Sequence, residues 1–251
     1  CTFYTIYIHV KELSPRIAQV VGEFTSMTKN TKIPVSVGEV IGRANAFDFS
    51  VHDDDVILKG FIIPEHYFPE TWKIHTVDMF AYFIEPIRSQ LLEKNIKESD
   101  PRAGKIDYDI DGRLVGNWFV ENTNGYEGLE SNRNQGRYWA THLSFAYDGI
   151  DTSLVMVSMG DFNGESKQFA VKGNSPDPAT VSISTDALKY ELVNYDYVTE
   201  TGQTWNRVSY GKGIKAVGTG QVQGVVLVQL IDDRKLKFEV FPGKIAADVT
   251  G

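Results

Sequence analysis

The sequence has little cysteine: Cys1 is the only one among 251 residues. A single cysteine excludes an internal disulfide framework and a zinc site built from several thiolates. A cysteine at the first position is typical of a lipidated N-terminus, but strand-like residues follow it at once, without a flexible tether. We therefore favour a chain that starts inside a strand, with upstream residues missing from the sequence.

Long apolar runs and an excess of positive charge are also absent. No run approaches the roughly 18–20 apolar residues that a membrane-spanning helix needs, so we expect no membrane span. The formal net charge is −8, from 25 basic and 33 acidic residues, and the basic residues are scattered. A nucleic-acid-binding protein usually has a basic patch, so we expect no nucleic-acid partner.

The pattern of apolar residues predicts a mainly β protein in two parts. Residues 2–10 and 46–51 alternate apolar and polar side chains as strands do, and helices are predicted at 13–25 and 78–95, the second divided by Pro86. Residues 97–102 are polar and contain a proline, which indicates a domain boundary. About ten short strands follow residue 104 with no helix between them, which predicts antiparallel pairing. We expect a β module with one helix over 1–96 and an antiparallel β-barrel over 104–251.

Three N-terminal segments carry a resemblance to a known family. Their sequences are YIHV (7–10), VSVGEVIG (35–42) and FDFSV (47–51). They resemble the second half of a lysostaphin-type zinc peptidase domain over about residues 3–60. That family cuts peptide crosslinks of bacterial cell walls, so the resemblance implies an antiparallel β module and an extracytoplasmic location.

The differences from the family pattern concern its histidines. His9 aligns with a catalytic histidine, but Ala46 and Asp48 stand where a catalytic and a zinc-binding histidine are expected. A catalytic zinc needs three protein ligands and an open position for water. Asp48, with His52 two strand positions beyond Ser50, is the remaining candidate for a metal. The resemblance thus implies a peptidase scaffold without its zinc chemistry, and an altered metal site is the alternative.

Residues 107–112 match the opening of a calcium loop. The three aspartates of DYDIDG have the required spacing, but Trp118 stands where the bidentate glutamate is expected. The same residues alternate like one arm of a hairpin that turns at Asp111-Gly112. We favour a solvent-facing hairpin, and calcium binding is the alternative.

The C-terminal part carries a second resemblance. Gly116-Asn117-Trp118 is similar to the Gly-x-Trp of the first strand of lipocalin-like barrels, and Arg234 is a candidate to pack against that tryptophan. In such a barrel Trp118, Trp139 and His142 would line a ligand cavity. The alternative is that these side chains simply fill the core.

These patterns lead to three functional hypotheses. The first, which we favour, is a non-catalytic extracytoplasmic binding protein whose ligand is a cell-wall glycopeptide, with no cofactor. The second is a metal-dependent hydrolase that uses zinc or calcium through Asp48 and His52 or through residues upstream. The third is a carrier that binds a small molecule in the C-terminal barrel.

Overall fold

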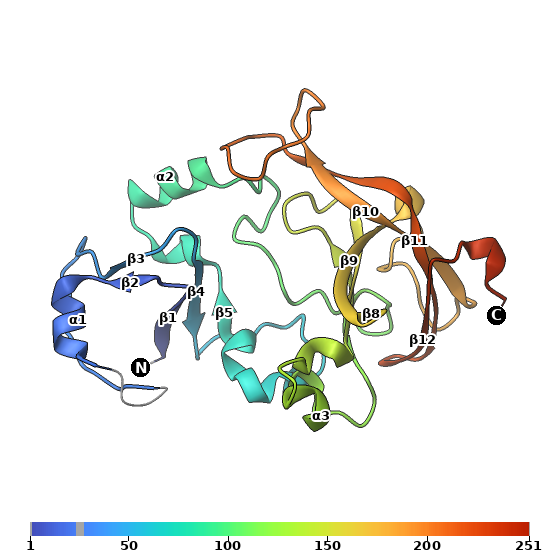
Figure 1. Cartoon of the computed structure of the whole chain (residues 1–251), viewed down its shortest axis with the longest axis horizontal. Helices are drawn as coiled ribbons and strands as arrows, with labels where there is room; N and C mark the ends of the chain where they lie inside the picture. The colour runs from blue at the N-terminus through green and yellow to red at the C-terminus, as the bar shows by residue number, and fades with distance from the viewer. Residues whose placement is uncertain (1, 24–27, 251) are drawn as a thin grey trace. The chain divides into compact units, whose positions relative to one another are not determined.

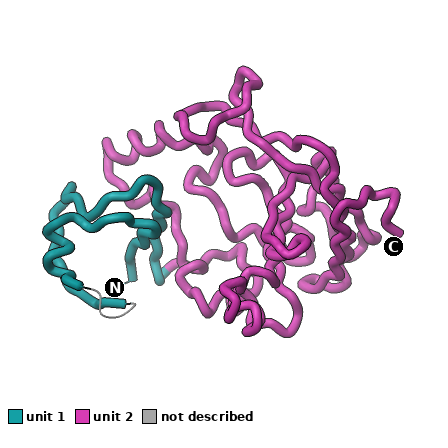
Figure 2. Tube along the Cα trace, viewed as in Figure 1, with its two compact units in different colours: residues 1–55 teal, residues 56–251 magenta. Residues whose placement is uncertain are grey.

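The computed structural model describes residues 2–23 and 28–250, so Cys1 and the end of the predicted helix 13–25 lie outside the described residues. The chain forms two compact units, residues 1–55 and 56–251 (Figure 2). Residues 56–96, which the sequence predicts to belong to an N-terminal module, are thus part of unit 2. Among residues 2–23 and 28–250, no helix has the length and apolar character required to cross a membrane.

Unit 1 is a small β module with one helix. β1 (Phe3–Ile8) pairs antiparallel with β4 (Asp48–Asp53), and the short β2 (Glu12–Leu13) pairs with β3 (Gly42–Arg43). Between them lies α1 (Pro15–Val21), which begins at a proline because the fixed φ of that residue suits the first helical position.

Unit 2 begins with irregular and helical segments. η1 (Pro64–His75) is a 3₁₀ segment interrupted at Glu70, and β5 (Thr76–Val77) follows it. The predicted helix 78–95 is divided near Pro86, as expected, into η2 (Met79–Tyr82) and α2 (Ile87–Lys94). Asp78 caps η2, because its carboxylate accepts the backbone N–H of Phe80 at 2.8 Å.

The rest of unit 2 is organised by one seven-stranded antiparallel sheet that curls into a half-barrel (Figure 1). Its strands neighbour one another in chain order, and they are β6 (Gly116–Phe119), β7 (His142–Tyr147), β8 (Val155–Phe162), β9 (Glu165–Val171), β10 (Leu188–Val198), β11 (Lys215–Asp232) and β12 (Lys235–Pro242). The short helical segments beside them are η3 (Gly125–Glu127), α3 (Glu130–Arg133), η4 (Tyr138–Thr141), η5 (Lys172–Asn174) and η6 (Ala246–Asp248). The predicted mainly β, antiparallel fold is confirmed, and its C-terminal sheet is a half-barrel.

The sheet has a core on each face because its strands alternate. In β8, Val155, Val157 and Met159 belong to one cluster of buried side chains, and Met156 belongs to the other. The first cluster includes Trp118, and the second forms around Tyr197 and Trp205.

The predicted hairpin arm at 105–110 is not a strand, and this prediction was wrong. Asp107 and Asp109 are each only 8 % exposed. The carboxylate of Asp107 accepts the N–H of Gly60 at 2.9 Å, and the N–H of Asp109 donates to the Gly60 carbonyl at 3.0 Å. The segment therefore runs beside residues 60–62 instead of pairing with β6.

Candidate functional site

Asp48 and His52 lie on one side of β4 but in different surroundings. His52 is fully buried, stacks on Tyr4 with 4.9 Å between ring centroids, and its Nε2 lies 2.7 Å from the hydroxyl of Ser50. Asp48 is at the other end of the strand, where its carboxylate lies 3.6 Å from Nε2 of His9. The side chains of this second pair are 73 % and 70 % exposed.

This arrangement does not bring the predicted metal ligands together. Four residues of a strand span about 13 Å, whereas two ligands of one ion lie within about 2 Å of it. Among residues 2–23 and 28–250, no three histidine, cysteine or acidic side chains are grouped so that they could hold a metal. The structure therefore does not bring Asp48 and His52 together, and metal binding through either of them stays a prediction.

Two aspartates of the calcium-like motif, Asp107 and Asp109, bind protein groups. Asp109 accepts the backbone N–H of Asn117 at 2.7 Å and that of Ile62 at 3.2 Å, and it pairs with Arg234 at 3.3 Å. Burial raises the pKa of Asp109, although these three donors oppose the rise. Its oxygens face protein donors, and calcium binding at the motif stays a prediction.

The predicted contact between Arg234 and Trp118 is present. The Arg234 guanidinium carbon lies 4.2 Å from the centroid of the Trp118 ring, and the indole N–H donates to the Leu114 carbonyl at 2.9 Å. Arg234 joins the turn before β12 to β6, since its Nη2 also donates to the Asn117 carbonyl at 3.2 Å.

Trp139 and His142 line a cavity of about 370 Å³ in unit 2. Five aromatic side chains from five separate segments form its walls: Phe61, Tyr67, Phe119, Tyr126 and Trp139. Its polar groups are Lys73, Asn117, His142 and three serines, Ser144, Ser158 and Ser166. Small-molecule sites typically combine apolar and aromatic walls with a few polar groups, at volumes of about 300–1,000 Å³.

His142 is fixed in this wall and is held neutral. Its Nε2 lies 2.9 Å from the Tyr126 carbonyl, which can only accept, so the neutral ring carries its proton on that nitrogen. Burial lowers the pKa of His142 and the nearby charge of Lys73 adds to this effect, whereas the bond to the Tyr126 carbonyl opposes it. Tyr126 packs against the same ring, with 4.8 Å between centroids.

A glycine allows β8 to approach the wall of this cavity. A Cβ at Gly160 would lie 1.6 Å from the Trp139 carbonyl oxygen, a distance that no side chain tolerates. Gly160 therefore lets η4 lie directly on the strand, which places Trp139 at the cavity.

A second cavity of about 520 Å³ adjoins the first. The two share Phe119, His142, Leu143 and Met159, and Trp118 and Arg234 line only the second. Trp118, Trp139 and His142 thus all lie at this pair of cavities, although Trp118 and Trp139 belong to different ones.

Tyr67 lines the first cavity, and its hydroxyl oxygen is buried from solvent. Tyr67 is 5 % exposed, and its hydroxyl has no hydrogen-bond partner among residues 2–23 and 28–250. The amide of Asn117 lies near enough to favour the ionised phenol, but burial dominates and raises the pKa of Tyr67. The Asn117 amide instead donates to the Ile106 carbonyl at 3.1 Å.

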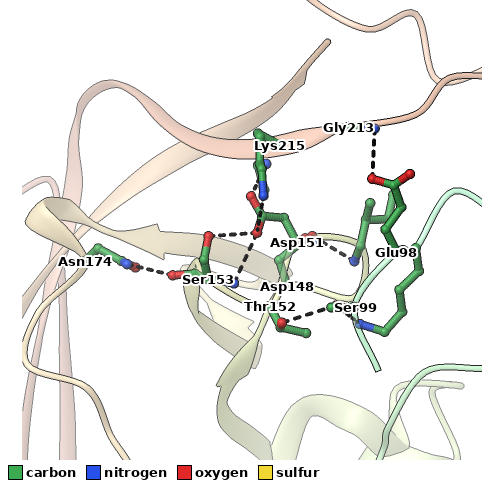
Figure 3. Close-up of polar contacts among 12 residues, drawn as sticks. Glu98, Ser99, Asp148, Asp151, Thr152, Ser153, Asn174, Gly213 and Lys215 are labelled. Carbon is green, nitrogen blue, oxygen red and sulfur yellow. Dashed lines mark hydrogen bonds and ion pairs between the residues drawn. The ribbon is translucent and has the colours of Figure 1, made fainter. Parts of the chain in front are cut away.

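A separate polar cluster is built on residues 148–153, between β7 and β8 (Figure 3). Asp148 accepts the hydroxyl of Tyr197 at 2.6 Å, and Asp151 accepts the hydroxyl of Ser153 at 2.7 Å and the N–H of Ala216 at 3.1 Å. Burial opposes the ionisation of Asp151, but these donors outweigh it and lower its pKa. The carboxylates are satisfied by protein groups, which indicates a structural role.

The same cluster ties residues 97–99 to the sheet. The ammonium of Lys97 lies 2.7 Å from the Ser99 hydroxyl, which Thr152 also contacts at 3.3 Å (Figure 3). Burial lowers the pKa of Lys97, and the charge of Asp148 opposes this effect. A lysine beside a serine is the composition of a nucleophile and its base, but Ser99 lines neither of the two cavities.

The sequence did not predict Tyr67, Lys73 and Tyr126 as site residues. They come from η1 and η3, irregular segments where no periodicity indicates which side chains point inward. The density of aromatic residues between 61 and 72 was the available signal. Comparison of the chain with protein-family models, with curated proteins and with solved structures finds no match.

Proposed function

We propose that this chain is a non-catalytic binding protein, and that it holds a small, ring-containing ligand in the aromatic cavity beside His142. The observation that supports this best is the convergence of five aromatic side chains on one cavity whose lining also includes Lys73, Asn117 and three serines. Aromatic walls favour a flat or ring-shaped ligand, and the polar groups can bind its oxygen or nitrogen atoms.

The proposal is compatible with two of the three functional hypotheses drawn from the sequence. A small-molecule carrier would use the cavity directly. A cell-wall glycopeptide would place a sugar ring against the aromatic walls and its hydroxyls near the three serines. An extracytoplasmic location remains part of the proposal and comes from the resemblance alone.

A cavity-filling variant tests the proposal. Ser158 lies on β8 and lines the cavity, so Ser158→Leu places three additional carbon atoms in the binding space. We expect calorimetric titration with a panel of aromatic acids, aromatic amides and amino sugars to detect binding to the unmodified protein and not to this variant. Phe68→Ala, in η1 but 57 % exposed and outside both cavities, is the matched control and should bind normally. Identical titrations for Ser158→Leu and the unmodified protein would contradict the proposal.

A further inference from the structure

The first cavity contains one formal charge, and it is positive. Lys73 is the only ionised side chain among the residues that line it, since His142 is held neutral and no carboxylate is present in the lining. The Lys73 side chain is 17 % exposed, so its charge lies largely away from bulk water. A charge in such a place attracts an opposite charge more strongly than one at the surface does.

The position of the Lys73 ammonium is fixed by three neighbours. It lies 4.0 Å from the ring centroid of Trp72, 4.4 Å from that of Tyr126, and 3.1 Å from the carboxylate of Glu70. An ammonium has three N–H donors, and the aromatic rings attract the cation without accepting conventional hydrogen bonds. Glu70 is one acceptor, which leaves donor capacity on Lys73 beside the cavity.

The neighbouring polar groups of the cavity are also rich in donors. Ser144, Ser158 and Ser166 have hydroxyl groups in the lining, and Asn117 has an amide there. A ligand that offers acceptor oxygens but no additional positive charge therefore complements this lining. A carboxylate provides two such oxygens, and its charge-assisted hydrogen bonds are stronger than those of a neutral amide.

We infer that the ligand is an organic acid, in which a ring stacks on the aromatic walls and one carboxylate binds the Lys73 ammonium. This inference rests on the proposed function and specifies its ligand class. An aromatic acid and a sugar acid share this chemistry, so both are tested. An uncharged ligand is the competing outcome.

The experiment compares matched acids and amides. Naphthalene-2-carboxylate and naphthalene-2-carboxamide differ only at the group that would face Lys73, and N-acetylmuramic acid with N-acetylglucosamine is the corresponding sugar pair. We expect at least one acid to bind about tenfold more tightly than its neutral counterpart, as one charge-assisted hydrogen bond contributes on that scale. Calorimetry at low ionic strength measures the ratio.

Three variants test whether Lys73 causes the preference for the acid. Lys73→Met keeps the length of the side chain and removes its charge, so it should abolish the preference for the acid while the amide binds as before. Glu70→Gln removes the competing carboxylate and should strengthen acid binding several-fold. Lys59→Met, at an exposed position in unit 2 outside the lining, is the control for general charge effects and should leave the ratio unchanged.

The possible failures are distinguishable. Equal binding of acid and neutral partner, or a preference that survives Lys73→Met, would overturn the acid assignment and leave the proposed function intact. If none of the four compounds binds, both proposals fail. The Glu70→Gln result decides the assignment independently if Lys73→Met does not fold.

Discussion

The guanidinium carbon of Arg234 lies 4.2 Å from the centroid of the Trp118 ring, and one of its nitrogens lies 3.3 Å from the carboxylate of Asp109. These contacts join the turn before β12 to β6, the two end strands of the half-barrel. Arg234→Met would leave Asp109 buried and unpaired, so we expect the free energy of unfolding to fall by about 3 kcal/mol. Urea denaturation measures the loss.

A double variant checks the origin of that loss. Asp109→Asn combined with Arg234→Met removes the unpaired charge and should recover part of the stability. A single Arg234→Met variant that is as stable as the unmodified protein would show that the stacked ion pair contributes nothing.

Gly160→Ala should disturb both stability and the cavity. The added methyl group would meet the Trp139 carbonyl oxygen at 1.6 Å, so η4 must move away from β8. We expect a loss of about 2 kcal/mol or more in thermal or urea unfolding, typical of overpacking. Gly149→Ala, where a Cβ meets no atom within 4 Å, is the matched control. Equal stability of the two variants would contradict the close packing of η4 on β8.

Stability should fall as the pH drops from about 7 to 5.5. Burial lowers the pKa of His142 and of His66 below their usual 6.5, so the folded state binds fewer protons than the unfolded state. The contribution of each is complete above pH 6.5 and is lost as the pH falls through that value toward the folded pKa. Denaturation curves at several pH values measure the slope, which His142→Gln should reduce. A protein that becomes more stable over this range would refute the prediction.

Tyr197→Phe should destabilise the second core. Its hydroxyl donates to the buried carboxylate of Asp148 at 2.6 Å, and hydrogen bonds to charged groups contribute about 1.5–3 kcal/mol. Tyr195→Phe removes a longer, exposed bond to Gln168 at 3.2 Å and should cost about 0.5 kcal/mol. Similar losses from the two variants would indicate that the hydrogen bond to Asp148 contributes no more to stability than the exposed bond to Gln168.

Protein purified without chelator should contain no stoichiometric zinc bound through Asp48. Its carboxylate faces His9 at the exposed end of β4, and His52 is buried far along the strand. Elemental analysis of the unmodified protein and of Asp48→Ala should give the same zinc content. Stoichiometric zinc that disappears in Asp48→Ala would contradict this expectation and support the altered metal site.

Much of the fold was predictable because alternation reports directly on strands with a buried face. It identified β1, β4 and most of the C-terminal strands, and the proline rule divided the helix at Pro86. Alternation was misleading at residues 105–110, because this segment is irregular and runs beside residues 60–62. The backbones of the two segments are joined partly by the carboxylates of Asp107 and Asp109, and such side-chain bonds leave no periodic signal.

The cavity was less predictable than the strands. Trp139 lies shortly before β7 and His142 is the first residue of that strand, so the sequence could indicate that both lie near it. Tyr67 and Lys73 reach the same place from a 3₁₀ segment about seventy residues earlier, which only the tertiary structure reveals. The contact between Arg234 and Trp118 was the exception, because the resemblance to lipocalin-like barrels indicated both residues.

The side chains shared by the two cavities couple the two spaces. Phe119, His142, Leu143 and Met159 line both of them. The imidazole is fixed there by its bond to the Tyr126 carbonyl and by three neighbouring rings, those of Phe119, Tyr126 and Tyr138. A substitution at any of the four shared positions would therefore reshape both cavities at once.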